Sequence, residues 1–347
     1  MLTNIYNQNF IKNIIICVKC KNNKIILKNN YYLCESCKEK YPIVYGIPIL
    51  ITKKQCDEHG LNYHKKNIEK EILKSKSFQI NKFGVLKYIE KMLLGTSGIL
   101  YENIKNLKKY PIANIPFAKL LRNEDILLLD IGCGWGRWTI NATQKGYQSI
   151  GIDKSLSSLI AAKKIAEKFK LKNCNFICCD VTQLPLKKGI FDKVFSFSFL
   201  QHFSENNLKI ILQNIAQKMK KNGEFKTQII NKYSLRGLYN LFKIKYFRKK
   251  MIKEGRIDNK INENNFSVRY FSIFKNYKIF KKYYIIKKLE NYSFFTQAQF
   301  SDFKIFSFKF KFYLLIAYTF NLMSNYIFFL KYFSDNILLT LKKIKSN

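Results

Sequence analysis

Asp130 and the glycines that follow it form the segment of this chain with the clearest chemical character. In ILLLDIGCGWG (residues 126–136) an apolar run ends in Asp130, and three glycines follow at alternate positions. The apolar run predicts a buried strand, and the glycines let the backbone turn sharply and approach a ligand. A dinucleotide-binding loop requires glycine at position 137, where this chain has Arg137. The carboxylate of Asp130 therefore suits a cationic or hydroxyl-bearing ligand better than a pyrophosphate.

Two further aspartates end the next two predicted strands. Asp153 closes YQSIGID (147–153), and Asp180 closes CNFICCD (174–180). Further strands are predicted at 191–200, 223–230 and 337–343, and amphipathic helices at 138–145, 156–169 and 208–219. Gly146 is expected to end the first of these helices, and Ser155 is the expected N-cap of the second. This alternation predicts a doubly wound, mostly parallel α/β sheet. Ligands of such sheets bind beyond the carboxyl ends of the strands, where the three aspartates are expected to meet.

The glycine segment resembles the first motif of class I S-adenosylmethionine-dependent methyltransferases. The strings at 179–203 and 222–231 resemble later motifs of the small-molecule branch of that superfamily. The resemblance implies a seven-stranded Rossmann-like sheet and S-adenosylmethionine as the cofactor. The expected cofactor-binding residues are Asp130, Gly132, Cys133, Gly134 and Gly136 for the methionine end, Asp153 for the ribose, Asp180 and Val181 for the adenine, and Ser196 beside the methyl group.

Methyl transfer needs little further chemistry from the protein. The sulfonium already makes the methyl group a good electrophile, so alignment of the acceptor supplies much of the rate. If the acceptor is a hydroxyl, a general base helps, and His202 in SFLQHF is the candidate. The alternative is that His202 only shapes the pocket at the start of a helix. The Asn-Pro-Pro-Tyr motif of nucleic-acid amino-methyltransferases is absent.

Four cysteines near the N-terminus have the spacing of a metal site. Cys17 and Cys20 form one C-x-x-C pair, Cys34 and Cys37 form another, and thirteen residues separate the pairs. Four thiolates at this spacing predict a tetrahedral, structural zinc ion, because no coordination position stays open. The alternative is a set of free thiols in a small apolar cluster.

The segment after these cysteines, YPIVYGIPIL (41–50), resembles the tail of a zinc-ribbon protein that activates certain tRNA, rRNA and protein methyltransferases. That tail usually carries an acidic residue where this chain has Tyr45. The domains expected are a zinc ribbon (1–52), a helical linker that caps the cofactor cleft (53–122) and the methyltransferase domain (123–347). His59 and His64 in the linker are expected in a solvated loop rather than as metal ligands.

Composition places few limits on the partner. The formal charge of +39 predicts attraction to anionic partners, but only six of the 62 basic residues are arginines. Phosphate and base recognition favours the arginine fork, so the charge alone identifies no partner. The sequence shows no signal peptide, so paired cysteines indicate metal rather than disulfides, and the cytoplasm is the expected location.

The stretch 312–330 contains no charged residue and reaches the length of a membrane span. Polar residues such as Asn321 and Ser324 lie in its middle and are costly in lipid, so a buried or interfacial insert is expected. The flanking Lys309, Lys311 and Lys331 suit anionic headgroups, which suggests peripheral membrane contact.

These features predict a methyltransferase that acts on a small-molecule or lipid-linked acceptor. One alternative is an RNA methyltransferase that uses the ribbon and the lysines to hold RNA. Another is a cofactor-binding partner protein without enzymatic activity. Lysines clustered beside the cleft would favour RNA, whereas an enclosed apolar cleft would favour the small molecule.

Overall fold

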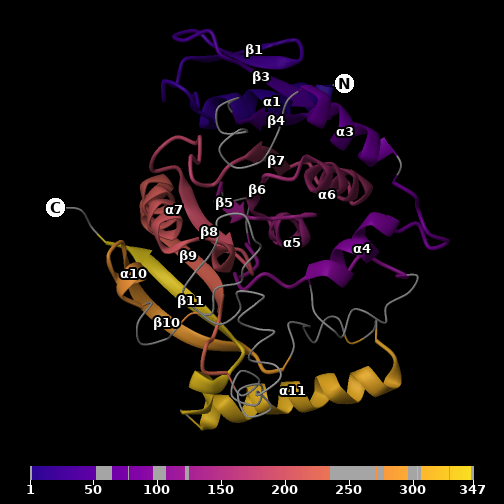
Figure 1. The fold of residues 1–347 in the computed structure, drawn as a ribbon, viewed down its shortest axis with the longest axis vertical. Coiled ribbons are helices and arrows are strands. Elements are labelled where there is room, and N and C mark those ends of the chain that lie inside the picture. Colours follow the sequence, from indigo (N-terminus) through magenta and orange to yellow (C-terminus); the bar gives the residue numbers. More distant parts are fainter. Residues whose placement is uncertain are drawn as a thin grey trace. The chain divides into compact units, whose positions relative to one another are not determined.

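The computed structural model describes residues 2–51, 65–76, 78–96, 107–121, 125–234, 271, 277–295, 303, 306–327 and 329–344 (Figure 1). His59 and His64 lie outside the described residues. The chain forms two compact units. The first comprises Met1–Ile89, Ile112–Phe195 and Gln217–Gly223, and the second comprises Glu90–Pro111, Ser196–Ala216 and Glu224–Asn347.

Helices and strands alternate along most of the described chain. The helices are α1 (Leu2–Ile14), α3 (Lys65–Lys76), α4 (Lys87–Thr96), α5 (Arg137–Gln144), α6 (Leu156–Lys168), α7 (Glu205–Lys218), α10 (Tyr277–Lys281) and α11 (Phe308–Tyr326), with short 3-10 turns η2 (Leu200–His202) and η4 (Leu330–Phe333). The strands are β1 (Ile25–Lys28), β2 (Tyr31–Cys34), β3 (Lys40–Val44), β4 (Ile47–Leu50), β5 (Leu127–Ile131), β6 (Gln148–Asp153), β7 (Cys174–Cys179), β8 (Phe191–Ser196), β9 (Met219–Ile230), β10 (Tyr284–Ser293) and β11 (Asn336–Lys343).

The α/β fold predicted from the alternating pattern is confirmed, but the seven-stranded sheet is wrong. The described strands form an eleven-stranded mixed sheet in the order β1-β2-β3-β4-β7-β6-β5-β8-β9-β11-β10. The seven strands from β7 to β10 correspond to the expected sheet, and four N-terminal strands extend its edge. The extension forms because Ile49 and Leu50 of β4 pair in parallel with Cys178 and Cys179 of β7. This pairing occupies hydrogen-bonding groups that an exposed edge strand would leave open.

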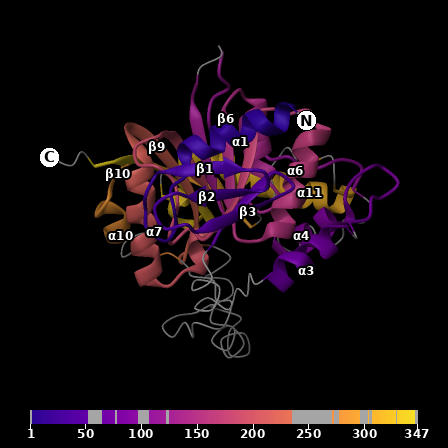
Figure 2. The same ribbon diagram turned by 90° about the horizontal axis from the view of Figure 1, so that it is seen from above.

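The N-terminal strands form an antiparallel ribbon that Figure 2 shows beside α1. Its last hairpin has two central residues, Tyr45 and Gly46, between the pairs Val44–Ile47 and Ile43–Pro48. Both central residues have positive φ, 50° and 74°, as a type I′ turn requires. Asp and Asn tolerate that conformation better than Tyr, which explains why an acidic residue suits this position in similar ribbons.

The parallel strands of the first unit are covered by helices with the expected ends. β5, β6 and β7 pair in parallel and are almost wholly buried, as their apolar runs predict. The Ser155 side chain accepts the Ser158 N–H at the start of α6, which confirms the predicted N-cap. Gly146 follows α5 with a φ of 98°, which is typical of a helix C-terminus. These elements hold Asp130, Asp153 and Asp180 at the ends of three neighbouring strands.

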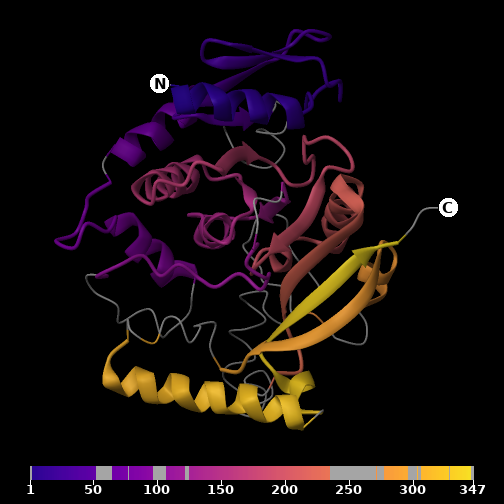
Figure 3. The ribbon, with the colours of Figure 1, turned by 180° about the vertical axis from the view of Figure 1, so that it is seen from behind.

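In the second unit, β11 lies between β9 and β10 and is antiparallel to both. The predicted final strand at 337–343 is therefore confirmed as β11. The apolar stretch at 312–330 falls mainly in α11, which contacts β10 (Figure 3). Leu314, Ala317 and Ser324 are buried on one side of α11, whereas most of its large apolar side chains are exposed. Of the expected buried or interfacial insert, burial thus holds for the inner side of α11 and not for its outer side. Among the described helices, none combines the length and apolarity that crossing a bilayer requires.

Candidate functional site

The glycine loop connects β5 to α5 and is fixed by hydrogen bonds to β6. The Gly132 and Cys133 N–H groups both donate to the Ile152 carbonyl, at 2.9 and 3.0 Å. The Gly134 N–H donates to the Asp153 carboxylate at 2.9 Å. The loop predicted from the glycine spacing is therefore held against the end of β6, and it brings two of the expected site segments together.

Two glycines of this loop have different structural requirements. Gly136 has a φ of 78°, and a Cβ added there would lie 2.9 Å from the Ala162 Cβ and 3.2 Å from the Phe176 ring. Gly136 is thus required by the packing of α5 against α6 and β7. Gly134 has a φ of 52°, but an added Cβ would meet no atom of the described residues within 4 Å. The loop therefore presents open space at Gly134, where a ligand can approach the backbone.

Cys133, within the glycine loop, and Asp130, at the end of β5 before it, are both buried. The Cys133 sulfur packs where β6 has Gly151, and a Cβ at Gly151 would lie 2.8 Å from it. Asp130 is 1% exposed, and its carboxylate accepts a 2.6 Å hydrogen bond from the Thr139 hydroxyl of α5. Burial raises the pKa of Asp130 to about 7, although the Thr139 donor opposes the shift. Asp130 thus joins β5 to α5 at the base of the loop.

Asp153 lies at the end of β6 and accepts two backbone hydrogen bonds. One carboxylate oxygen accepts the Gly134 N–H, and the other accepts the Ser155 N–H at 2.9 Å. Burial raises the pKa of Asp153, and these two donors work against the rise. A carboxylate held by the glycine loop and by the start of α6 is fixed in position before any ligand binds.

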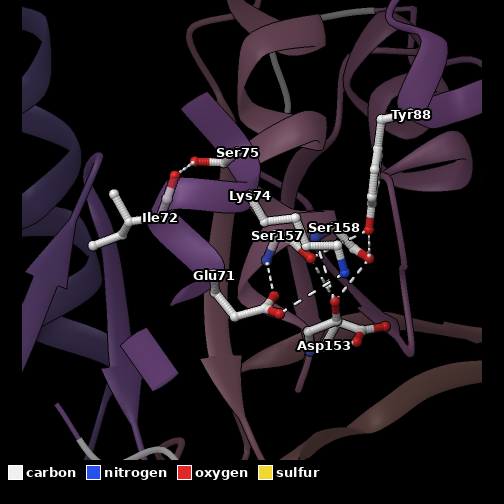
Figure 4. A network of polar contacts seen from close by, with 9 residues as sticks. Glu71, Ile72, Lys74, Ser75, Tyr88, Asp153, Ser157 and Ser158 are labelled. Carbon is white, nitrogen blue, oxygen red and sulfur yellow. Dashed lines mark hydrogen bonds and ion pairs between the residues drawn. The ribbon is translucent and has the colours of Figure 1, made fainter. Parts of the chain in front are cut away.

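A second group of polar residues lies beside Asp153, and no pattern in the sequence predicted it. The Glu71 carboxylate of α3 accepts the Ser157 N–H at 3.0 Å, and the Tyr88 hydroxyl lies 2.9 Å from the Ser158 hydroxyl (Figure 4). Glu71 therefore satisfies a backbone donor at the start of α6, as a capping residue would. No periodicity or motif marks a carboxylate that acts across 86 residues.

Asp180 and Val181 follow β7. One Asp180 oxygen accepts both the backbone N–H and the hydroxyl of Thr182, each at 2.7 Å. Val181 is buried beside it. This Asx-turn fixes the carboxylate at the carboxyl end of β7, so the first unit places all three aspartates at the ends of adjacent strands.

Ser196 and His202 belong to the second unit. Ser196 ends β8 fully buried, and its hydroxyl has no hydrogen-bond partner in the part of the chain that the structure describes. His202 is the last residue of η2, and its side chain is exposed. Its backbone N–H donates to the Phe199 carbonyl at 3.1 Å. The roles expected for both residues stay predictions.

The second unit also contains a buried polar chain that the sequence did not reveal. The side-chain oxygen of Gln228 accepts hydrogen bonds from the backbone N–H and the hydroxyl of Ser198, at 2.7 and 3.1 Å. The Gln228 amide donates to Asn336, whose own amide donates to the Ser293 hydroxyl at 2.8 Å. Ser198 has a φ of 51°, which a non-glycine residue rarely adopts. The network therefore fixes the strained turn after β8 to β9, β11 and β10.

The four N-terminal cysteines gather into one cluster. Their sulfur atoms all lie within 4.8 Å of one another, with Cys17–Cys37 and Cys20–Cys34 both at 3.5 Å. Four thiolates about 2.3 Å from a tetrahedral zinc lie roughly 3.8 Å apart, so the spacing fits that ion. The Tyr41 hydroxyl accepts the Val18 N–H at 2.9 Å and lies 3.1 Å from the Cys17 sulfur, as an outer-sphere partner would.

Comparison with known proteins identifies the family. Residues 128–223 match the model of a methyltransferase domain. An uncharacterised protein of Methanocaldococcus jannaschii is 33% identical over 54% of this chain and 75% of its own length. A ubiquinone biosynthesis O-methyltransferase of Nitrobacter winogradskyi is 32% identical over 30% of this chain and 39% of that enzyme. A ribosomal RNA small subunit methyltransferase A of Ureaplasma parvum is 30% identical over 42% and 50%, respectively.

Residues 128–223 form the domain of an S-adenosylmethionine-dependent methyltransferase. The family match begins within β5 and ends within β9, so it includes the glycine loop and all three aspartates. The chain spans half or less of the two named enzymes, which by their names act on different acceptors. The family therefore identifies the methyl donor and leaves the acceptor open.

Proposed function

We propose that this methyltransferase transfers the methyl group of S-adenosylmethionine to a small-molecule or lipid-linked acceptor. The observation that carries the donor site is the open space at Gly134, next to an Asp153 carboxylate already fixed by the loop. Open space beside a glycine and a fixed acceptor group suits a ligand with hydroxyl and amino groups, which the cofactor has.

Each cofactor-binding residue has a distinct task in this proposal. Asp153 accepts hydrogen bonds from the ribose hydroxyls, and Asp180 accepts the adenine amine while Val181 packs beside the ring. The backbone from Gly132 to Gly136 holds the methionine end. Asp130 acts beneath the loop, because its carboxylate is buried on Thr139. The bound sulfonium supplies the electrophilic methyl group, so the protein mainly orients the acceptor.

Labelling with the methyl donor tests the acceptor class directly. The full chain is incubated with S-adenosylmethionine carrying a labelled methyl group and with fractionated cell extract. We expect label in the small-molecule or lipid fraction. Label in RNA would instead support the RNA alternative. Donor binding without labelling of any fraction would support the non-enzymatic alternative and contradict the proposal.

The outer face of α11 supports an apolar, lipid-linked acceptor. Phe312, Leu315 and Ile316 are 62%, 47% and 41% exposed, whereas the polar Ser324 is buried on the inner side. Asn321 also accepts a hydrogen bond from the Asn291 amide of β10, and the apolar Leu314 and Ala317 are buried on the same side as Ser324. The outer face of α11 is therefore more apolar than that of an ordinary surface helix.

We infer that this outer face rests on an anionic bilayer surface. Residues 303–334 contain four lysines and no acidic residue, so their charge complements anionic headgroups. Flotation of the full chain with vesicles of phosphatidylcholine and phosphatidylserine tests this contact. We expect wild type to float and the double variant Leu315→Ser/Ile316→Ser to stay at the bottom of the gradient.

Leu121→Ser is the matched control, because Leu121 is 96% exposed and belongs to the first unit. This variant is expected to float like wild type. Wild type that remains at the bottom as a monomer, or as a dimer formed through α11, would contradict membrane contact.

We also propose that Cys17, Cys20, Cys34 and Cys37 hold one structural zinc ion. The support is the sulfur spacing together with the outer-sphere position of Tyr41. Four thiolates complete the coordination sphere, so the metal would stabilise the ribbon and take no part in methyl transfer.

A further inference from the structure

A cavity of about 290 Å³ lies in the first unit, where the cysteine-containing segment meets the loop between β7 and β8. Its walls come from Ile16, from residues 21–23 and from residues 186–188. Two backbone hydrogen bonds hold these segments together: the Ile16 N–H donates to the Pro185 carbonyl at 3.0 Å, and the Lys187 N–H donates to the Ile14 carbonyl at 2.7 Å. The cavity is therefore formed by fixed segments far apart in the sequence.

The cavity is lined by three lysines and by no carboxylate. Lys21, Lys187 and Lys188 contribute to its walls, together with the neutral amides of Asn22 and Asn23. The Lys21 ammonium donates one hydrogen bond to the Gln183 side chain at 2.8 Å, which orients it. Three like charges around one small space repel one another, and an anion between them would relieve that repulsion.

Lys218, the last residue of α7, adds a fourth and buried positive charge. The Lys218 side chain is only 5% exposed. Burial, together with the charges of Lys188 and Lys21, lowers the pKa of Lys218 to about 8. A largely buried lysine beside other lysines is costly, so an anion at this site would stabilise it.

We propose that this cavity binds a phosphate group, held by Lys21, Lys187 and Lys188 and stabilised by the charge of Lys218. A volume of 290 Å³ has room for roughly ten waters at ~30 Å³ each, so it accommodates a phosphate group with part of its hydration shell. Lysine binds phosphate as a point charge and needs no arginine fork. The phosphate belongs either to a small phosphate ester or to the backbone of a nucleic acid.

This site does not depend on methyl transfer. No residue of the cavity belongs to the glycine loop or carries one of the three site aspartates. Binding of phosphate can therefore be measured without the methyl donor, and failure of one proposal leaves the other standing.

Calorimetry with pyrophosphate and with a short single-stranded RNA tests the site on the full chain. The pocket variant is Lys187→Ala/Lys188→Ala, and the control Lys172→Ala/Lys287→Ala removes the same charge from exposed positions elsewhere. We expect the pocket variant to bind pyrophosphate at least tenfold more weakly than wild type and the control to stay within twofold. A parallel loss of RNA binding in the pocket variant identifies a nucleic-acid source, and unchanged RNA binding identifies a small phosphate ester.

Equal loss in the pocket and control variants for both probes would overturn the proposal, because general charge would then explain the binding. Lys218→Met provides a second measurement. Pyrophosphate is expected to raise the thermal midpoint of wild type and to have much less effect on this variant. An equal rise in both proteins would remove Lys218 from the site.

Discussion

Substituting the glycines of the β5–α5 loop one at a time separates the packing of the loop from its role in cofactor binding. In Gly136→Ala, the new Cβ meets Ala162 at 2.9 Å and Phe176 at 3.2 Å, at a φ of 78°. A left-handed non-glycine residue costs about 1–2 kcal/mol, and overpacking a core costs about 1–3 kcal/mol more. The lower backbone entropy of the unfolded alanine chain offsets about 0.4–1 kcal/mol. The expected net loss of stability is therefore about 2–4 kcal/mol.

Gly189→Ala is the matched control, because Gly189 also has positive φ (65°) but an added Cβ there meets no described atom within 4 Å. It is expected to lose only about 1 kcal/mol, the cost of the backbone conformation alone. Thermal unfolding followed by circular dichroism measures the difference, at ~2–4 °C per kcal/mol for a domain of this size. A midpoint for Gly136→Ala equal to that of Gly189→Ala would refute the packing argument.

Gly134→Ala should behave in the opposite way. Its added Cβ also meets no described atom within 4 Å, so its stability should match that of Gly189→Ala. Because the Cβ projects into the space assigned to the cofactor, its affinity for S-adenosylmethionine should fall at least tenfold by calorimetry, while Gly189→Ala binds normally. Normal cofactor binding by Gly134→Ala would place the ligand elsewhere.

Three further predictions concern charged and metal-binding residues. Asp153→Ala should weaken S-adenosylmethionine binding by about 1–3 kcal/mol in calorimetry, and unchanged affinity would remove Asp153 from the site. Wild type should contain one zinc per chain by elemental analysis and Cys34→Ser far less, whereas fully folded, metal-free wild type would refute the metal site. The raised pKa of Asp130 means that the folded state binds more protons than the unfolded state between about pH 4 and pH 7. Without cofactor, Asp130 should therefore contribute fully to the free energy of unfolding at about pH 4. That contribution should fall by on the order of 4 kcal/mol as the pH rises to about 7. Asp130→Asn should lose that part of the slope in urea titrations, and an unchanged slope would contradict the assignment.

The sequence determined the parts of this protein that local pattern controls. Continuous apolar runs predicted β5, β6 and β7, since strands buried on both faces have no alternation to obscure them. The glycine spacing predicted the loop that follows β5, and the Ser155 cap predicted the start of α6. The two C-x-x-C pairs likewise predicted the cysteine cluster, because each pair lies on one short turn.

Only the tertiary structure decided how distant segments combine. The ribbon extends the main sheet because β4 pairs with β7, and nothing in IPIL specifies which strand it joins. Glu71 reaches the start of α6, and Gln228 links Ser198 to Asn336, through contacts between residues far apart in the chain. The apolar outer face of α11 and the burial of Lys218 also depend on which side each element buries. Composition and periodicity along the chain do not contain that information, because burial is set by the partner segment.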